Sequence, residues 1–248
     1  MTDLTQQLAR FAAGAAVVPD EVRAMAAGAI EAVAAAAAGR ADHPAVTAIA
    51  AVADELGTPP EAGVPGRSRR YSAPWAALLT GAAAASGSAA AGYATIAVPA
   101  GLAVGAARGA GLDAVTDAVA IGLEIAERLD AALAGSLGTF DPVATIGRLG
   151  AAATAGRLLG SPAAAVGHAL GIAATQAAGF AVMVSEAIGV LQYGKAAADA
   201  VQAAYLADGG FTAAAASIEG RRGFTALLAP GAGPVADLSQ TWTLRSRR

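Results

Sequence analysis

The feature that most constrains the fold is a long uncharged stretch, because no charged residue occurs from Tyr71 to Ala107. On length alone this stretch is sufficient to cross a membrane. Pro74, the run from Ser86 to Ser88, and Pro99 interrupt it, and most of its other residues are alanine and glycine. Membrane insertion is driven by leucine, isoleucine, phenylalanine and valine rather than by these small residues. We therefore predict a helical hairpin buried inside a protein, with no membrane partner.

The apolar character of the whole chain comes from alanine. Of its 248 residues, 56% are hydrophobic and 14% charged, while aromatic residues make up only 4%. Alanine is the best intrinsic helix former, and its small side chain allows helices to approach closely. The composition therefore predicts a tightly packed all-α protein.

Charge and cysteine content exclude several classes of function. The net charge is -3, and the basic runs are limited to residues 67–70 and 245–248, so no nucleic-acid partner is expected. The absence of cysteine excludes disulfides, thiolate catalysis and cysteine metal sites. Only two histidines occur, far apart, so we expect no metal and no cofactor. The N-terminus lacks the basic region of a secretory signal, which indicates a cytoplasmic protein.

Prolines, glycines and capping residues divide the chain into helices. Acidic residues open a helix over 20–39, and Pro44 opens another that runs to Leu56. Pro142 and Pro162 each follow a good N-cap, Asp141 and Ser161, and should open two more. Further helices are predicted over residues 73–86, 99–109, 114–133, 194–206 and 212–218, with a loop over 58–66. Residues 1–248 are therefore expected to form a single all-α bundle of roughly eight to ten helices.

A resemblance to a known family rests on ordered motifs along most of the chain. The most specific is Asp141-Pro142-Val143-Ala144-Thr145-Ile146-Gly147, and His168-Ala169-Leu170-Gly171-Ile172-Ala173 follows it. Together with Leu8–Gly14, Arg69–Gly81 and Phe211–Phe224, these motifs resemble the helical domain of the MmgE/PrpD family. That family includes 2-methylcitrate dehydratase and cis-aconitate decarboxylase. Its members are typically nearly twice as long and add an α+β lid, which would begin after Asp237–Leu244 here, so we expect no lid domain.

The resemblance also implies that the family's catalytic groups are replaced. A family histidine falls at Asp141, a family lysine falls at Gly189, and family aspartates fall within Ser86–Ala91, which holds no acid. A second family lysine, at the start of the lid, has no counterpart. Dehydration or decarboxylation of a citrate-like acid needs cations to hold carboxylates and a base of suitable pKa. We therefore do not expect a methylcitrate dehydratase.

Polar and aromatic residues near these positions are the candidates for a rebuilt site. The catalytic candidates are Asp141, Glu186 and Tyr193. The substrate-binding candidates are Gln192, Lys195, Trp75, Tyr93, Phe180 and Met183. Each polar candidate has a structural alternative: Asp141 as a helix N-cap, Glu186 as a surface residue at a helix start, and Lys195 as a solvated or packing side chain. His168 is expected to be a hydrogen-bonded core residue.

Three functions remain open. The leading hypothesis is a cofactor-independent cyclase that acts on a largely apolar polyketide-type molecule by fixing its reactive conformer. The second is a lyase or isomerase of small organic acids, with Asp141 and Glu186 as a rebuilt acid/base pair. The third is a non-catalytic subunit. The resemblance implies a homodimer through the helical domain in each case.

Overall fold

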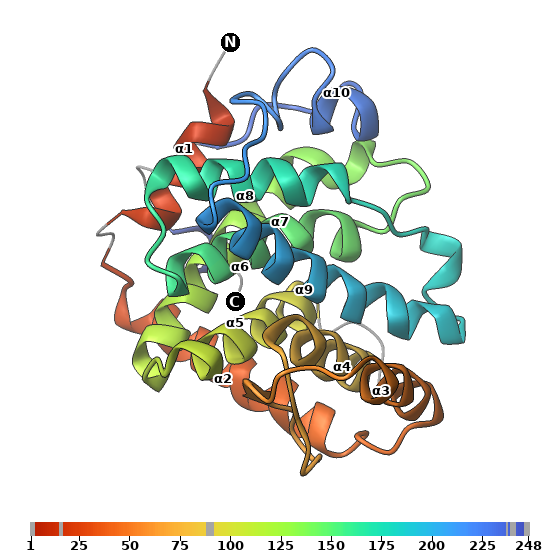
Figure 1. The fold of residues 1–248 in the computed structure, drawn as a ribbon. Helices are drawn as coiled ribbons and strands as arrows, with labels where there is room; N and C mark the ends of the chain where they lie inside the picture. The colour runs from red at the N-terminus through yellow and green to blue at the C-terminus, as the bar shows by residue number, and fades with distance from the viewer. Residues whose placement is uncertain (1–2, 15–16, 88–91, 237, 239–241, 246–248) are drawn as a thin grey trace.

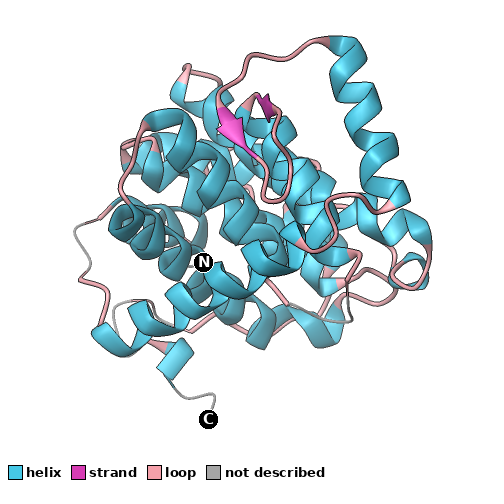
Figure 2. Cartoon of the chain, turned by 90° about the horizontal axis from the view of Figure 1, so that it is seen from below, coloured by secondary structure: helices cyan, strands magenta, loops and turns pink. Residues whose placement is uncertain are grey.

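The computed structural model describes residues 3–14, 17–87, 92–236, 238 and 242–245, which form ten α-helices and one two-stranded antiparallel hairpin (Figures 1 and 2). This confirms the all-α prediction and the expected number of helices. The helices are α1 (Leu4–Ala13), α2 (Asp20–Ala38), α3 (Pro44–Leu56), α4 (Ala73–Ala85), α5 (Ala94–Arg108), α6 (Leu112–Leu133), α7 (Pro142–Leu158), α8 (Ala163–Thr175), α9 (Ala187–Asp208) and α10 (Phe224–Leu228). Strands β1 (Ala62–Gly63) and β2 (Arg70–Tyr71) pair within and just beyond the predicted loop.

The uncharged stretch forms the buried hairpin that its composition predicts. It supplies α4 and α5, which pack against each other, and Leu79 and Ile96 on these helices are fully buried. No helix in the described part of the chain is both long enough and apolar enough to cross a membrane. The hairpin is instead covered by protein, with α2 and α9 packed on α4 and with α6 and α7 packed on α5.

Helix α9 organises the part of the fold that matters for function. It contacts α4, α7 and α8 and runs between α8 and α4 in Figure 1. It crosses α4 at a pair of glycines: a methyl group added at Gly81 would lie 3.1 Å from the Cα of Gly194. Two helices can approach this closely only where neither carries a side chain. The glycine pair therefore fixes α9 against the buried hairpin.

Helix boundaries differ from the sequence prediction at two starts. Helix α5 begins at Ala94, so Pro99, predicted as its first residue, lies inside the helix. Helix α9 begins at Ala187 rather than at Gly194, so Gly189 and Gly194 both lie inside the helix. Helix α8 follows Pro162, whereas the hydroxyl of Ser161 donates a hydrogen bond to Asp208 instead of capping the helix. The N-cap prediction for Ser161 was therefore wrong.

The helix predicted over residues 212–218 is also wrong, since this segment forms turns. Side chains from two other helices accept hydrogen bonds from its backbone N–H groups. The Ala213 N–H donates to Nδ1 of His168, 3.1 Å away, and the Ile218 N–H donates to Oγ1 of Thr5 at the same distance. Partners contributed by α8 and α1 thus replace the hydrogen bonds that a helix would supply. His168 is, as expected, a hydrogen-bonded scaffold residue.

Candidate functional site

Asp141 lies at the N-terminus of α7 and caps that helix. Its Oδ2 accepts the Ala144 N–H at 2.9 Å, and its own backbone N–H donates to the Gly179 carbonyl at 2.9 Å. The residue is 7% exposed. Asp-Pro at a helix start places the carboxylate over the free N–H groups of the first turn, while the proline removes one of those donors. Asp141 is therefore the structural N-cap that the sequence offered as one alternative.

Gln192, on the first turns of α9, connects this cap to the loop before α9. Its Nε2 donates to Oδ2 of Asp141 at 3.3 Å, and its Oε1 accepts the Phe180 N–H at 3.1 Å. The Phe180 ring stacks on the ring of Phe140, with 5.9 Å between centroids. The amide thus holds a predicted binding aromatic next to the predicted catalytic carboxylate. Three of the candidate residues, Asp141, Gln192 and Phe180, form one hydrogen-bonded unit.

Two tyrosines on neighbouring helices remain neutral phenols. Burial, followed by the negative charge of nearby Asp141, raises the pKa of Tyr193 to about 12. Tyr93, at the start of α5, donates to Asp130 at 2.5 Å, and burial and that contact raise its pKa. A phenol whose pKa is raised keeps its proton at neutral pH. Tyr193 is therefore a hydrogen-bond donor at the site rather than a base.

About two turns further along both helices lies a second buried polar cluster, which the sequence reasoning missed. Arg148 on α7 donates to the Gln176 carbonyl at 2.6 Å and pairs with Asp199 on α9 at 3.4 Å. Both side chains are almost completely buried, and burial lowers the pKa of Arg148. Lys195, half exposed, also pairs with Asp199. The spacing of these residues could have indicated the cluster. Arg148 follows Asp141 by about two helical turns, and Asp199 follows Gln192 by the same number of residues, so each pair shares a helix face.

The remaining candidates lie outside the Asp141 unit. Glu186 is exposed at the start of α9 and makes no side-chain capping bond, and Met183 is 37% exposed in the turn before it. Trp75 lies half-buried beside Pro74 at the beginning of α4. Gly81 of α4 meets α9 at Gly194, and Pro74 lies beside residues near the C-terminal end of α9. Trp75 therefore lies toward that end of α9, whereas Gln192 lies near its start. The acid-free segment Ser86–Ala91 is described only as far as Gly87.

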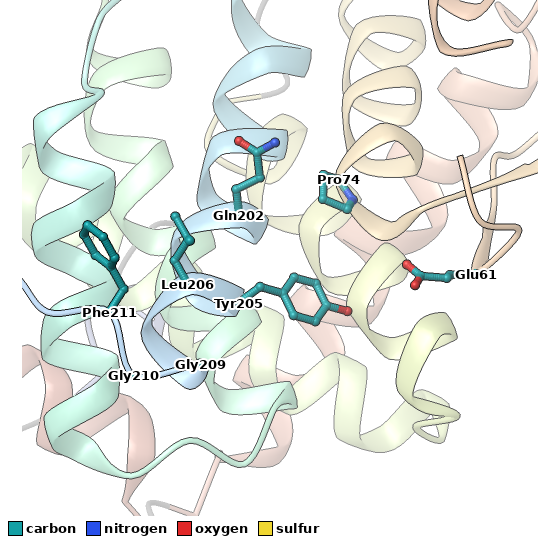
Figure 3. Close-up of a pocket in the computed structure, with 8 residues that line it drawn as sticks. All are labelled: Glu61, Pro74, Gln202, Tyr205, Leu206, Gly209, Gly210 and Phe211. Carbon is teal, nitrogen blue, oxygen red and sulfur yellow. The ribbon is translucent and has the colours of Figure 1, made fainter. Parts of the chain in front are cut away.

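A separate cavity lies at the other end of α9, where α9 ends beside the start of α4 (Figure 3). It has a volume of about 780 Å³. It is lined by Glu61, Pro74, Gln202, Tyr205, Leu206, Gly209, Gly210 and Phe211. None of the candidate residues from the sequence is among them. The sequence did not indicate this cavity, because its lining residues come from a loop, two helices and a turn.

The chemistry available at the Asp141 unit is that of hydrogen bonding and apolar contact. The carboxylate already accepts hydrogen bonds from the Ala144 N–H and the Gln192 amide. The cations Arg148 and Lys195 both face Asp199. Within the described ranges, no group of three or more histidine, aspartate or glutamate side chains is arranged to hold a metal ion.

Comparison with known proteins agrees with the motif resemblance. The family model of the MmgE/PrpD N-terminal domain matches residues 6–236. No curated protein matches the sequence. Since the matched region covers most of the chain, the protein belongs to the MmgE/PrpD family and contains its helical N-terminal domain.

Proposed function

We propose that this member of the MmgE/PrpD family acts on a neutral, largely apolar small molecule, and that it catalyses a cyclisation or rearrangement by holding one reactive conformer. Such a reaction can proceed without net proton transfer, so positioning alone can supply much of the rate enhancement. The observation that carries the proposal is the engagement of Asp141. At the position where the family resemblance implies a catalytic histidine, the chain has a carboxylate that serves the scaffold.

The hydrogen bonds of Asp141 argue against acid/base catalysis there. Two N–H donors converge on Oδ2, one from the Ala144 backbone and one from the Gln192 amide. These bonds use the oxygen through which a catalytic carboxylate would exchange a proton with its substrate. A general acid at this position would have to give up those interactions in each catalytic cycle.

The charges around the site also disfavour an acidic substrate. A citrate-like acid needs arginine or lysine donors for its carboxylates. Arg148 is directed to the Gln176 carbonyl and to Asp199, and Lys195 pairs with the same aspartate. Asp141 itself would repel a substrate carboxylate. This arrangement supports a neutral ligand over the organic acids of the second hypothesis, and exposed Glu186 offers no visible pairing with Asp141.

An apolar surface adjoins the Asp141 unit and suits such a ligand. The turn between Phe180 and α9 exposes large hydrophobic side chains, including Val182 at 74% and Phe180 at 51%. Exposed apolar groups gathered on one segment mark a binding surface more often than scattered ones do. The same turn could serve a second copy of the chain, which is the third hypothesis, a dimerising subunit without catalysis. A dimer whose formation depends on Val182, combined with no probe binding, would favour that alternative.

The test compares a neutral polyene with the acids of the family. Diphenylhexatriene binding is followed by fluorescence, and binding of cis-aconitate and 2-methylcitrate by calorimetry. We expect the polyene to bind and the acids to give no heat of binding. Phe180→Ala should weaken polyene binding, whereas Leu112→Ala, which truncates an exposed apolar side chain at the start of α6, should not. Saturable binding of either acid would refute the proposal and restore the lyase hypothesis.

A further inference from the structure

We infer that the cavity at the C-terminal end of α9 binds a small apolar molecule that carries a protonated amine. This site is distinct from the Asp141 unit. Gln192 and Gln202 lie on the same helix about 15 Å apart along its axis, given the rise of an α-helix. The inference therefore extends beyond the proposed function and can fail independently of it.

The size and walls of the cavity suit a small organic ligand. Its volume of about 780 Å³ falls within the range of roughly 300 to 1,000 Å³ that is usual for such sites. Leu206 and Phe211 form one wall, and Pro74 lies across from them (Figure 3). Leu206 is 45% exposed and Phe211 59%, so apolar surface here is left in contact with solvent. Burying that surface against a ligand would be favourable.

A single carboxylate gives the cavity its charge preference. Among the lining residues, all of which the structure describes, only Glu61 is charged. Its Oε2 accepts the Ala73 N–H at 3.0 Å, which fixes the carboxylate at the edge of the cavity. The cavity also adjoins the last turn of α9, where the helix dipole places partial negative charge. Both features favour a cation over an anion.

Tyr205 provides the surface between the apolar wall and the carboxylate. Its side chain extends toward Glu61 (Figure 3). Burial raises its pKa, the charge of nearby Arg108 opposes that rise, and Glu61 adds to it. A phenol oxygen can accept a hydrogen bond from an ammonium. A ligand ammonium would lie between this hydroxyl and Glu61, with its apolar body on Leu206 and Phe211.

The cations near the cavity are already engaged. Arg108 stacks on the Tyr205 ring, 5.4 Å from its centroid, and pairs with Asp208 at 3.7 Å. Arg70 donates to the Pro60 carbonyl at 3.1 Å and to the Glu61 carbonyl at 2.5 Å. These contacts leave the Glu61 carboxylate without a salt bridge among the described residues. An incoming ammonium would supply one.

Three matched probes test this inference on the wild-type protein by calorimetry: phenylbutylamine, phenylbutanol and phenylbutyrate. We expect the amine to bind at least about threefold more tightly than the alcohol, as for a partly exposed ion pair, and the carboxylate to bind more weakly than both. Added salt should reduce the affinity for the amine but leave that for the alcohol unchanged. These comparisons need no variant. Equal affinities for amine and alcohol, or no amine binding, would overturn the inference.

Variants then locate the bound amine. Glu61→Gln keeps an oxygen for the Ala73 N–H and removes only the charge, so it should lower amine affinity to the level of the alcohol. Phe211→Ala should weaken both ligands. Phe180→Ala, which affects the Asp141 unit, and Leu112→Ala, a 66% exposed control, should affect neither. Amine binding that Glu61→Gln leaves unchanged, or that Phe180→Ala abolishes, would contradict the assignment of this cavity.

Discussion

The side-chain amide of Gln192 donates to Oδ2 of Asp141 at 3.3 Å, and the same oxygen accepts the Ala144 N–H at 2.9 Å. Two helices far apart in sequence are thus joined at one carboxylate oxygen. Because both bonds use the same atom, an asparagine could accept both through its single carbonyl oxygen. The scaffold role of residue 141 can therefore be separated from its charge by mutation.

Asp141→Asn should cost little stability, whereas Asp141→Ala should lower the free energy of unfolding by about 1 to 2 kcal/mol, because alanine removes an N-cap. Urea unfolding of the two variants measures the difference. A large and equal loss in both variants would show that the charge of the carboxylate, rather than the cap, stabilises this helix start.

Tyr193 should give the protein an alkaline limit of stability. Its pKa is raised from 10.0 in an unfolded chain to about 12, so the folded state holds this proton more tightly. The stabilisation is complete below about pH 10 and is lost as the pH rises toward 12. Unfolding free energies across this range should fall more steeply in wild type than in Tyr193→Phe.

Tyrosinate absorbance tests the cause of that shift. Asp141 contributes to the raised pKa through its charge and its hydrogen bond, after burial. In Asp141→Asn, one tyrosine should therefore titrate at a lower pH than in the wild type. Identical titration curves for the two proteins would mean that burial alone accounts for the shift.

Gly179 should tolerate no side chain, because its φ of +142° is a conformation that other residues rarely adopt. An added methyl group would also lie 2.7 Å from the Ala144 Cβ and 3.1 Å from the Gln192 side chain. Gly179→Ala should destabilise the protein by roughly 1 to 3 kcal/mol. The control is Gly28→Ala on α2, where no atom lies within 4 Å; this change should stabilise by roughly 0.5 to 1 kcal/mol. Chemical denaturation of both variants checks the opposite signs.

Arg148 should be essential for stability. Arg148→Met removes the donor to the Gln176 carbonyl and a cation facing buried Asp199. Breaking such a pair from one side typically costs about 3 to 5 kcal/mol. Arg148→Lys keeps the positive charge, but a lysine cannot donate to the Gln176 carbonyl and face Asp199 with the planar geometry of a guanidinium. Its stability should lie between those of Arg148→Met and wild type. A Met variant as stable as wild type would show that Lys195 alone is sufficient for Asp199.

Much of the fold could be predicted from local sequence signals. The uncharged stretch gave the α4–α5 hairpin, and Asp141-Pro142 gave the start of α7, because capping and helix propensity act within one turn. The signals failed where distant side chains decide the structure. The side chains of Thr5 and His168 accept hydrogen bonds from the N–H groups of residues 218 and 213. No local sequence pattern indicates these long-range bonds.

The candidate site shows the same division. Asp141, Gln192 and Tyr193 could be proposed from the sequence because they lie at or beside positions that match the family's pocket motifs, and Phe180 as an apolar wall residue. Arg148 and Asp199 were missed because their pairing depends on how α7 crosses α9. The cavity at Phe211 was missed because three separate segments form it.

The most direct test of the central claim is diphenylhexatriene affinity in Asp141→Asn, measured by fluorescence beside wild type. If Asp141 is scaffold and the ligand is neutral, the two dissociation constants should agree within about twofold, a difference below 0.5 kcal/mol. A loss of affinity of about tenfold or more in a variant that remains as stable as wild type would assign the charge of Asp141 to ligand binding, and would contradict this account.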